Sequence, residues 1–144
     1  MIGGLIDRDV ASTLRRKRAL RLDGLRLFYF ITSEGEANVG GRTTVDQAAS
    51  LQFNCRPDAF VVGGEGPGRP ATGELFSQVA EASGEVPVVC GTGCKLENVE
   101  EVLEHCSGAF VGSTFKRDGI FENPIDQARV SQFMAKVRET RGEE

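Results

Sequence analysis

The sequence contains no tryptophan and a single histidine, His105, among its 144 residues. His105 falls late in a predicted helix, so neither a Ser-His-Asp nor a Cys-His catalytic arrangement can be assembled at the predicted loops. No apolar segment approaches the length that spans a bilayer. The short apolar run at the N-terminus, followed by Asp7 and Asp9, is not typical of a signal or transit peptide. We therefore expect no membrane span and a cytoplasmic protein.

Basic residues are outnumbered: 17 Lys and Arg face 21 Asp and Glu, for a net charge of −4. A nucleic-acid-binding domain usually carries a basic surplus, so we expect no nucleic-acid partner. The one basic cluster, Arg15 to Arg18, is flanked by apolar residues and is interpreted as the solvated face of an amphipathic helix.

The four cysteines raise the question of a metal site or a disulfide, above all in the stretch VVCGTGC from Val88 to Cys94. In a reducing compartment they are expected to be thiols. Zinc needs about four ligands at short, paired spacing, which this sequence does not offer. We therefore expect no metal and no cofactor, and we interpret Cys90 as a small core residue at the end of a strand.

Apolar runs alternate with segments of helical periodicity along the chain. A leading helix over residues 1–24 and four βα units over residues 25–144 predict one α/β domain, 1–144, with a parallel sheet. The spacing of the later strands is roughly that of one βα unit in an eight-fold barrel. Strands are predicted at Leu25–Ile31, Asp58–Gly64, Val86–Cys90 and Gly108–Gly112, and helices at Ala11–Leu20, Thr44–Asn54, Gly73–Ser83, Glu97–Cys106 and, after the N-cap Asp126, up to Thr140.

Glycine-rich turns follow the last two predicted strands. In parallel α/β folds the loops after the carboxyl ends of the strands carry function, and glycine lets backbone N–H groups approach an anion closely. One such turn is usually only a tight connection, but two sequential turns followed by a lysine favour a phosphate site. The predicted phosphate-binding residues are Gly91, Thr92, Gly93, Gly112, Ser113 and Lys116.

The sequence gives little support for nucleotide binding or for acid–base catalysis. The glycine clusters complete neither a P-loop nor a G-x-G-x-x-G motif, which argues against nucleotide sites of those types. The acid–base groups nearest the predicted loops are Glu65 and Asp118, with Lys116 as the adjacent cation, and none has an identifiable partner. Glu65 and Asp118 are therefore the candidate catalytic residues of a site for which we do not expect full catalytic competence.

Several stretches together resemble the BtpA family, a TIM-barrel group named after a photosystem I biogenesis protein. The resemblance rests on DAFVVGGEGPGRP, on VPVVCGTGCKLENVEEVLE, on the segment GAFVGSTFKRDGIFENPIDQARV and on LIDRDVASTLRRKRAL. It covers the C-terminal half of the family's barrel and implies a parallel (βα)₄ half-barrel with a leading helix. A Lys-His pair usual in the family's fifth strand is replaced here by FYFITSEGEA, and Lys95-Leu96 replace its usual Thr-Pro.

Half a barrel needs a partner surface. A complete (βα)₈ barrel usually takes about 250 residues, and its closure removes the exposed strand edges. We therefore expect a homodimer, or pairing with a complementary half-barrel chain; a rearranged open sheet or a truncated product remain as alternatives. The leading functional hypothesis is binding of a phosphorylated small molecule. The family name also implies a non-enzymatic assembly factor, and a divergent sugar-phosphate isomerase or aldolase is the third hypothesis.

Overall fold

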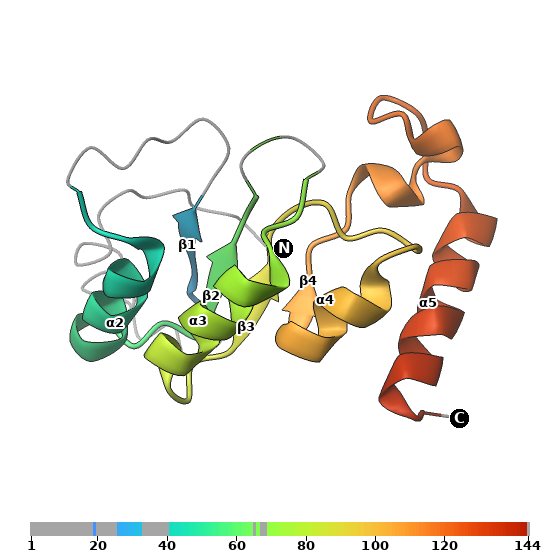
Figure 1. Cartoon of the computed structure of the whole chain (residues 1–144). Helices are drawn as coiled ribbons and strands as arrows, with labels where there is room; N and C mark the ends of the chain where they lie inside the picture. Colours follow the sequence, from blue (N-terminus) through green and yellow to red (C-terminus); the bar gives the residue numbers. More distant parts are fainter. Residues whose placement is uncertain (1–18, 20–25, 33–40, 65, 67–68, 144) are drawn as a thin grey trace.

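A computed structural model of the chain describes residues 19, 26–32, 41–64, 66 and 69–143. Strands and helices alternate along these residues (Figure 1). The predicted leading helix lies outside the described residues except for Ala19. The elements are β1 (Phe28–Thr32), α2 (Thr44–Asn54), β2 (Ala59–Val62), α3 (Gly73–Ser83), β3 (Val88–Cys90), α4 (Val99–His105), β4 (Gly108–Ala109), the 3₁₀ turns η1 (Ser113–Phe115) and η2 (Arg117–Gly119), and α5 (Gln127–Arg141).

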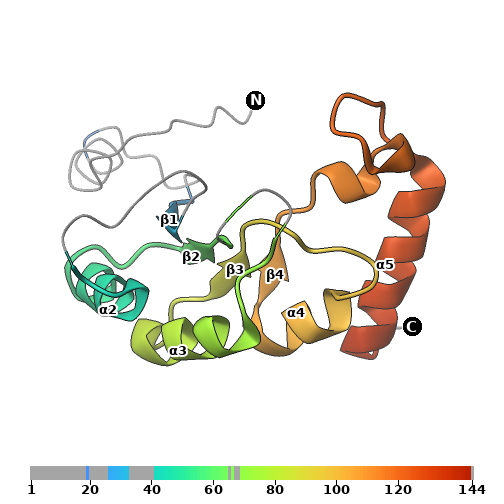
Figure 2. The same cartoon turned by 45° about the horizontal axis from the view of Figure 1, so that its top comes forward.

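The four strands form one parallel sheet in the order β1-β2-β3-β4. Each strand is followed by a helix or by a loop that leads to one, so the fold is a parallel (βα)₄ unit, as predicted. Figure 2 shows α2, α3 and α4 in a row along one side of the sheet, with α5 beyond β4. All four carboxyl ends of the strands consequently meet at one edge of the sheet.

Local signals explain where the helices begin and end. The Asp126 carboxylate accepts hydrogen bonds from the N–H groups of Ala128 and Arg129, which confirms it as the N-cap of α5. Thr43 and Asp46 form a reciprocal capping box at α2. Gly84 ends α3 with a φ of 61°, a conformation that favours glycine. These caps fix the helix ends.

The last strand is shorter than the sequence predicts. Gly108 to Gly112 reads as a strand, but β4 comprises Gly108–Ala109, and beyond it Phe110 donates a single N–H to the Cys90 carbonyl at 2.8 Å. β4 pairs with β3 and with no further strand among the described residues. β3 ends at Cys90, the partner of Ala109, so β4 has no further residue of that strand to pair with.

The principal core lies between the sheet and its helices. Alternate residues of the strands, such as Ile31, Phe60 and Cys90, pack against the apolar faces of the helices. Phe76 and Val79 of α3 are almost fully buried there. The core is therefore built from the face of the sheet that the helices cover.

The opposite, inner face of the sheet carries a small aromatic cluster. Phe110 lies in ring contact with Phe28 and Phe30, with centroids 5.9 and 6.3 Å apart. A flat sheet would separate strands β1 and β4 by about 14 Å, three strand spacings, so the contact indicates a strongly curved sheet. Val61, which is paired in register with Phe30, is fully buried, whereas residues Phe28, Phe30 and Phe110 are each 45–48% exposed.

Candidate functional site

The loops after β2 and β3 are packed tightly against each other at the carboxyl edge of the sheet. The Thr92 hydroxyl donates to the Arg69 carbonyl at 3.1 Å and accepts the Gly64 N–H at 3.4 Å. Gly93 has a φ of +79°, and a Cβ there would overlap the backbone nitrogen of Pro70. Glycine is therefore required at position 93 both by conformation and by space.

The loop after β3 is also tied to the loop after β4. The Thr114 hydroxyl donates to the Cys94 carbonyl at 3.1 Å. Asn98 supports the same loop from within, because its side chain donates to the Gly93 carbonyl at 3.1 Å and accepts the Lys95 N–H at 2.7 Å. The two glycine-rich turns predicted to form one site therefore lie side by side.

The predicted phosphate-binding residues differ in what their polar groups already do. The Gly91 N–H is used by the sheet, since it donates to the Val62 carbonyl at 2.8 Å. The N–H groups of Thr92, Gly93, Ser113 and Thr114, by contrast, donate to no described residue. Gly112 precedes η1, and a Cβ on it would meet open space.

Lys116 lies at the end of η1, farther along the same loop. Its N–H donates to the Ser113 carbonyl at 2.9 Å, and its backbone forms an isolated antiparallel bridge with Ile125. This bridge closes the loop that contains η2 before α5 begins. Lys116 is thus fixed through its backbone, and its side chain is half-buried.

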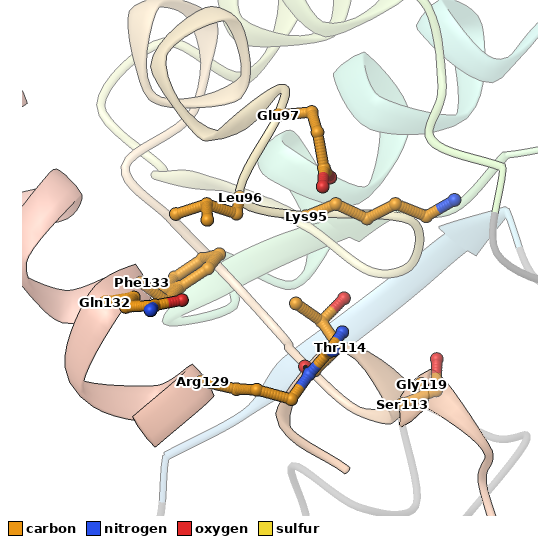
Figure 3. A pocket seen from close by; sticks show the side chains of 9 residues that line it. All are labelled: Lys95, Leu96, Glu97, Ser113, Thr114, Gly119, Arg129, Gln132 and Phe133. Carbon is orange, nitrogen blue, oxygen red and sulfur yellow. Dashed lines mark hydrogen bonds between the residues drawn. The ribbon is translucent and has the colours of Figure 1, made fainter. Parts of the chain in front are cut away.

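A cavity of about 360 Å³ opens next to the β4 turn, on the side of α5 (Figure 3). One wall is the loop after β3, the second is η1 and the third is the first part of α5. Of the predicted site residues only Ser113 lines it among the described residues. The lining residues are Lys95, Leu96, Glu97, Ser113, Thr114, Gly119, Arg129, Gln132 and Phe133.

Arg129 is the best-positioned cation of this cavity. Its Nε donates to the Thr114 carbonyl at 2.8 Å, so the guanidinium lies against η1 (Figure 3). Arg129 is not among the site residues predicted from the sequence. A signal existed, because Arg129 is the third residue of α5, and a cation in the first turn opposes the helix dipole.

The candidate acid–base residues are not gathered around this cavity. Glu65 lies outside the described residues. Asp118 is exposed in η2 with a φ of 57°, and its neighbour Gly119, not Asp118, lines the cavity. His105 sits at the end of α4, where its Nδ1 lies 3.0 Å from the Ser77 hydroxyl. That contact joins α3 to α4.

The cysteines of the VVCGTGC stretch are buried structural thiols. Cys90, Cys94 and Cys106 are free and buried, and the Cys90 thiol donates to the Thr92 carbonyl at 3.1 Å. Burial, with a smaller contribution from the neighbouring cysteines, raises the pKa of Cys94 to about 11 and that of Cys106 to about 12. Thiols this hard to ionise are poor nucleophiles and poor metal ligands near neutral pH.

The described residues offer neither a metal-ligand cluster nor a helix suited to crossing a membrane. No group of three or more His, Cys, Asp or Glu side chains in that part of the chain could hold a metal ion. None of the helices in the same residues combines the length and the apolar character that a bilayer crossing requires.

Sequence comparison identifies relatives of the chain. The sequence model of the BtpA family matches residues 2–139. The putative sgc region protein SgcQ of Escherichia coli is 38% identical over 138 residues, which are 96% of this chain and 52% of that protein. The photosystem I biogenesis protein BtpA of Synechocystis is 29% identical over 136 residues, 94% of this chain and 47% of the relative. The chain thus spans about half the length of these curated relatives.

A solved structure supports the fold. Phosphoribosyl anthranilate isomerase from Thermococcus kodakaraensis superimposes with a TM-score of 0.59 at 22% identity, over 89% of this chain and 58% of that one. At this identity the likeness concerns the fold alone. A four-stranded parallel sheet with alternating helices fits half of such a TIM-barrel-like structure.

Proposed function

The chain belongs to the BtpA family, and we propose that it binds a phosphorylated small molecule at the turns after β3 and β4. The observation that carries the proposal is the pairing of these turns through the Thr114–Cys94 hydrogen bond. Beside that bond, the N–H groups of Gly93 and Ser113 donate to no described residue. In (βα)₈ barrels the loops after the last two strands, with a short extra helix, frequently bind phosphate.

A positively charged side chain near these turns also favours a phosphate site. Backbone N–H groups at glycine turns bind phosphate by directional hydrogen bonds, and a nearby cation adds an electrostatic contribution. Lys116 is the cation that we propose for this role, at the end of the 3₁₀ turn that begins with Ser113. The four thiols of the chain are free, which fits the cytoplasm as the proposed compartment.

We expect binding without turnover. A general acid or base must come within hydrogen-bonding reach of the reacting group, and the side chain of exposed Asp118 makes no hydrogen bond or ion pair with another described residue. Measurable isomerisation or aldol cleavage of sugar phosphates, lost in Asp118→Asn or in Glu65→Gln, would instead favour a divergent isomerase or aldolase.

The proposed phosphate site is tested by titrating the full chain with glycerol 3-phosphate and ribose 5-phosphate while following backbone amide resonances. The amides of Thr92, Gly93 and Ser113 should shift. Gly112→Asp should weaken binding about tenfold or more, since it places a carboxylate beside the proposed anion. Gly112→Asn has nearly the same shape without the charge and should bind like the wild type. Both side chains have room, because a Cβ at position 112 meets open space.

Equal binding by Gly112→Asp and Gly112→Asn, or unchanged amides at millimolar ligand, would refute the phosphate site. A protein partner that co-purifies with the chain and is retained by Gly112→Asp would favour the alternative, a non-enzymatic assembly factor. The name of the Synechocystis relative, a photosystem I biogenesis protein, is the reason to keep that alternative.

We further propose that a second half-barrel covers the inner face of the sheet, supplied by a second copy of this chain or by a complementary chain. The three half-exposed rings of Phe28, Phe30 and Phe110 carry this proposal. Exposed aromatic clusters of this kind mark interaction surfaces. The solution mass, measured by light scattering at several concentrations, should be that of a dimer; a compact monomer throughout would contradict self-association.

A further inference from the structure

The cavity between the loop after β3 and α5 is lined by polar side-chain groups that bond to no described residue. Nζ of Lys95, the terminal nitrogens of Arg129, the Ser113 hydroxyl and the Gln132 amide make no hydrogen bond or ion pair with any described residue. They come from three different elements and line one space of about 360 Å³. That volume lies in the range of small-molecule sites.

Arg129 is oriented for this space by its surroundings. Its Nε–H is used by the Thr114 carbonyl at 2.8 Å, which holds the plane of the guanidinium and leaves its two terminal nitrogens as donors. The side chain belongs to the first turn of α5, where the helix dipole disfavours a cation. An anion bound at the guanidinium would remove that conflict.

The other lining residues limit what the anion can be. Lys95 and Arg129 are cationic and Glu97 is anionic, so the three charged side chains sum to a single positive charge. Figure 3 shows the Glu97 carboxylate and the Lys95 side chain on the side of the cavity opposite Arg129, with the Lys95 Nζ directed away from the guanidinium. Leu96 and Phe133 add an apolar wall. One negative charge joined to an apolar part matches this lining better than a dianion does.

We propose that this cavity binds the carboxylate of a small organic acid, with the terminal nitrogens of Arg129 on the carboxylate, Lys95 as a second positive charge on the opposite wall, and the apolar part of the ligand against Leu96 and Phe133. A guanidinium presents paired N–H donors that match the two oxygens of a carboxylate. This site is distinct from the phosphate site proposed above. Its described lining residues include only one of the predicted phosphate-binding residues, Ser113.

The test uses three probes of one shape on the full-length chain: benzoate, the neutral benzamide and the dianionic phenyl phosphate. Benzoate should shift the Arg129 Nε–H resonance and the amides of Ser113 and Thr114, whereas benzamide should not. The amides of Thr92 and Gly93, which do not line the cavity, should stay in place. A response of Thr92, Gly93 and Ser113 without a shift of the Arg129 Nε–H would report the phosphate site and would overturn the cavity proposal.

Substitutions test which positively charged side chains contribute to benzoate binding. Arg129→Gln should weaken benzoate binding about tenfold, and Lys95→Gln, which removes a more distant positive charge, about threefold. Arg138→Gln removes the same charge from the other end of α5, away from the cavity lining, and should bind like the wild type. Lys95→Gln keeps the test decisive if Arg129→Gln disturbs η1, because the Lys95 side chain bonds to no described residue.

Two results would overturn the proposal. One is the absence of any shift at Arg129, Ser113 or Thr114 with millimolar benzoate. The other is tighter binding of phenyl phosphate than of benzoate in the wild type, which would replace the carboxylate by a phosphate as the recognised group.

Discussion

At the scale of single residues, two glycines of the candidate phosphate site have different reasons to be glycine. Gly93 has a positive φ and lies against the backbone of Arg69 and Pro70. Gly112 has a φ of −109° and open space where a Cβ would be. The first is therefore a structural requirement of two packed loops. The second is tolerant of a side chain, so any loss of binding on substituting it reports on the ligand.

Stability measurements should separate the two roles. Gly93→Ala should lower the free energy of unfolding by about 2 kcal/mol or more, since a Cβ is strained at positive φ and overlaps Pro70. Gly112→Ala should stay within about 0.5 kcal/mol of the wild type. Urea denaturation followed by circular dichroism measures both. Equal effects of the two substitutions would mean that the loops after β2 and β3 are not packed as described.

At the scale of elements, the start of α5 links the helix to the β4 loop. Asp126 caps the helix, and its own N–H donates to the Phe115 carbonyl at 2.8 Å. Phe115 packs edge-on against Phe133 with centroids 5.1 Å apart, and Arg129 reaches back to Thr114. The helix end, the 3₁₀ turn and the cavity wall are therefore one connected unit.

We therefore expect the N-cap of α5 to affect both the stability of the protein and the position of the Arg129 side chain. Asp126→Ala should cost about 1 kcal/mol of unfolding free energy, because two N–H groups lose their acceptor. It should also broaden or shift the Arg129 Nε–H resonance. Asp126→Asn retains a capping oxygen and should behave much like the wild type. Full stability of Asp126→Ala would contradict the cap.

At the scale of the whole molecule, the curved sheet has one covered face and one partly open face. The helices bury the first, and Phe28, Phe30 and Phe110 cover part of the second. Nearly half of each of these ring-bearing residues is exposed, which is unfavourable in water unless another surface covers the rings.

Self-association should therefore depend on the inner-face rings and not on exposed aromatics in general. Phe110→Ser should weaken the proposed dimer about tenfold or more, as expected for a truncated interface anchor. Phe53→Ser provides the matched control, because Phe53 is 82% exposed on α2, among the helices on the other side of the sheet. Analytical ultracentrifugation measures both dissociation constants. Equal weakening by both variants would exclude the inner face as the dimer surface.

Several features of this chain could be predicted from the sequence because they depend on neighbours along the chain. Alternation of apolar runs and helical periodicity gave the order of strands and helices, and Asp126 marked the start of α5 correctly. The glycine turns after β3 and β4 were also found by their local pattern. The shortness of β4 was missed, because strand pairing depends on which neighbour lies alongside.

The sequence by itself determined the parallel (βα)₄ order, the helix caps and the two turns, since each arises from local conformational preference and from the periodicity of apolar residues. Only the tertiary structure decided that Lys95 and Arg129 line one cavity and that Phe110 meets Phe28 and Phe30 across the sheet. These contacts join distant segments, and they depend on the curvature of the sheet and the direction of α5. No local pattern encodes either quantity, because both result from packing the whole set of elements at once.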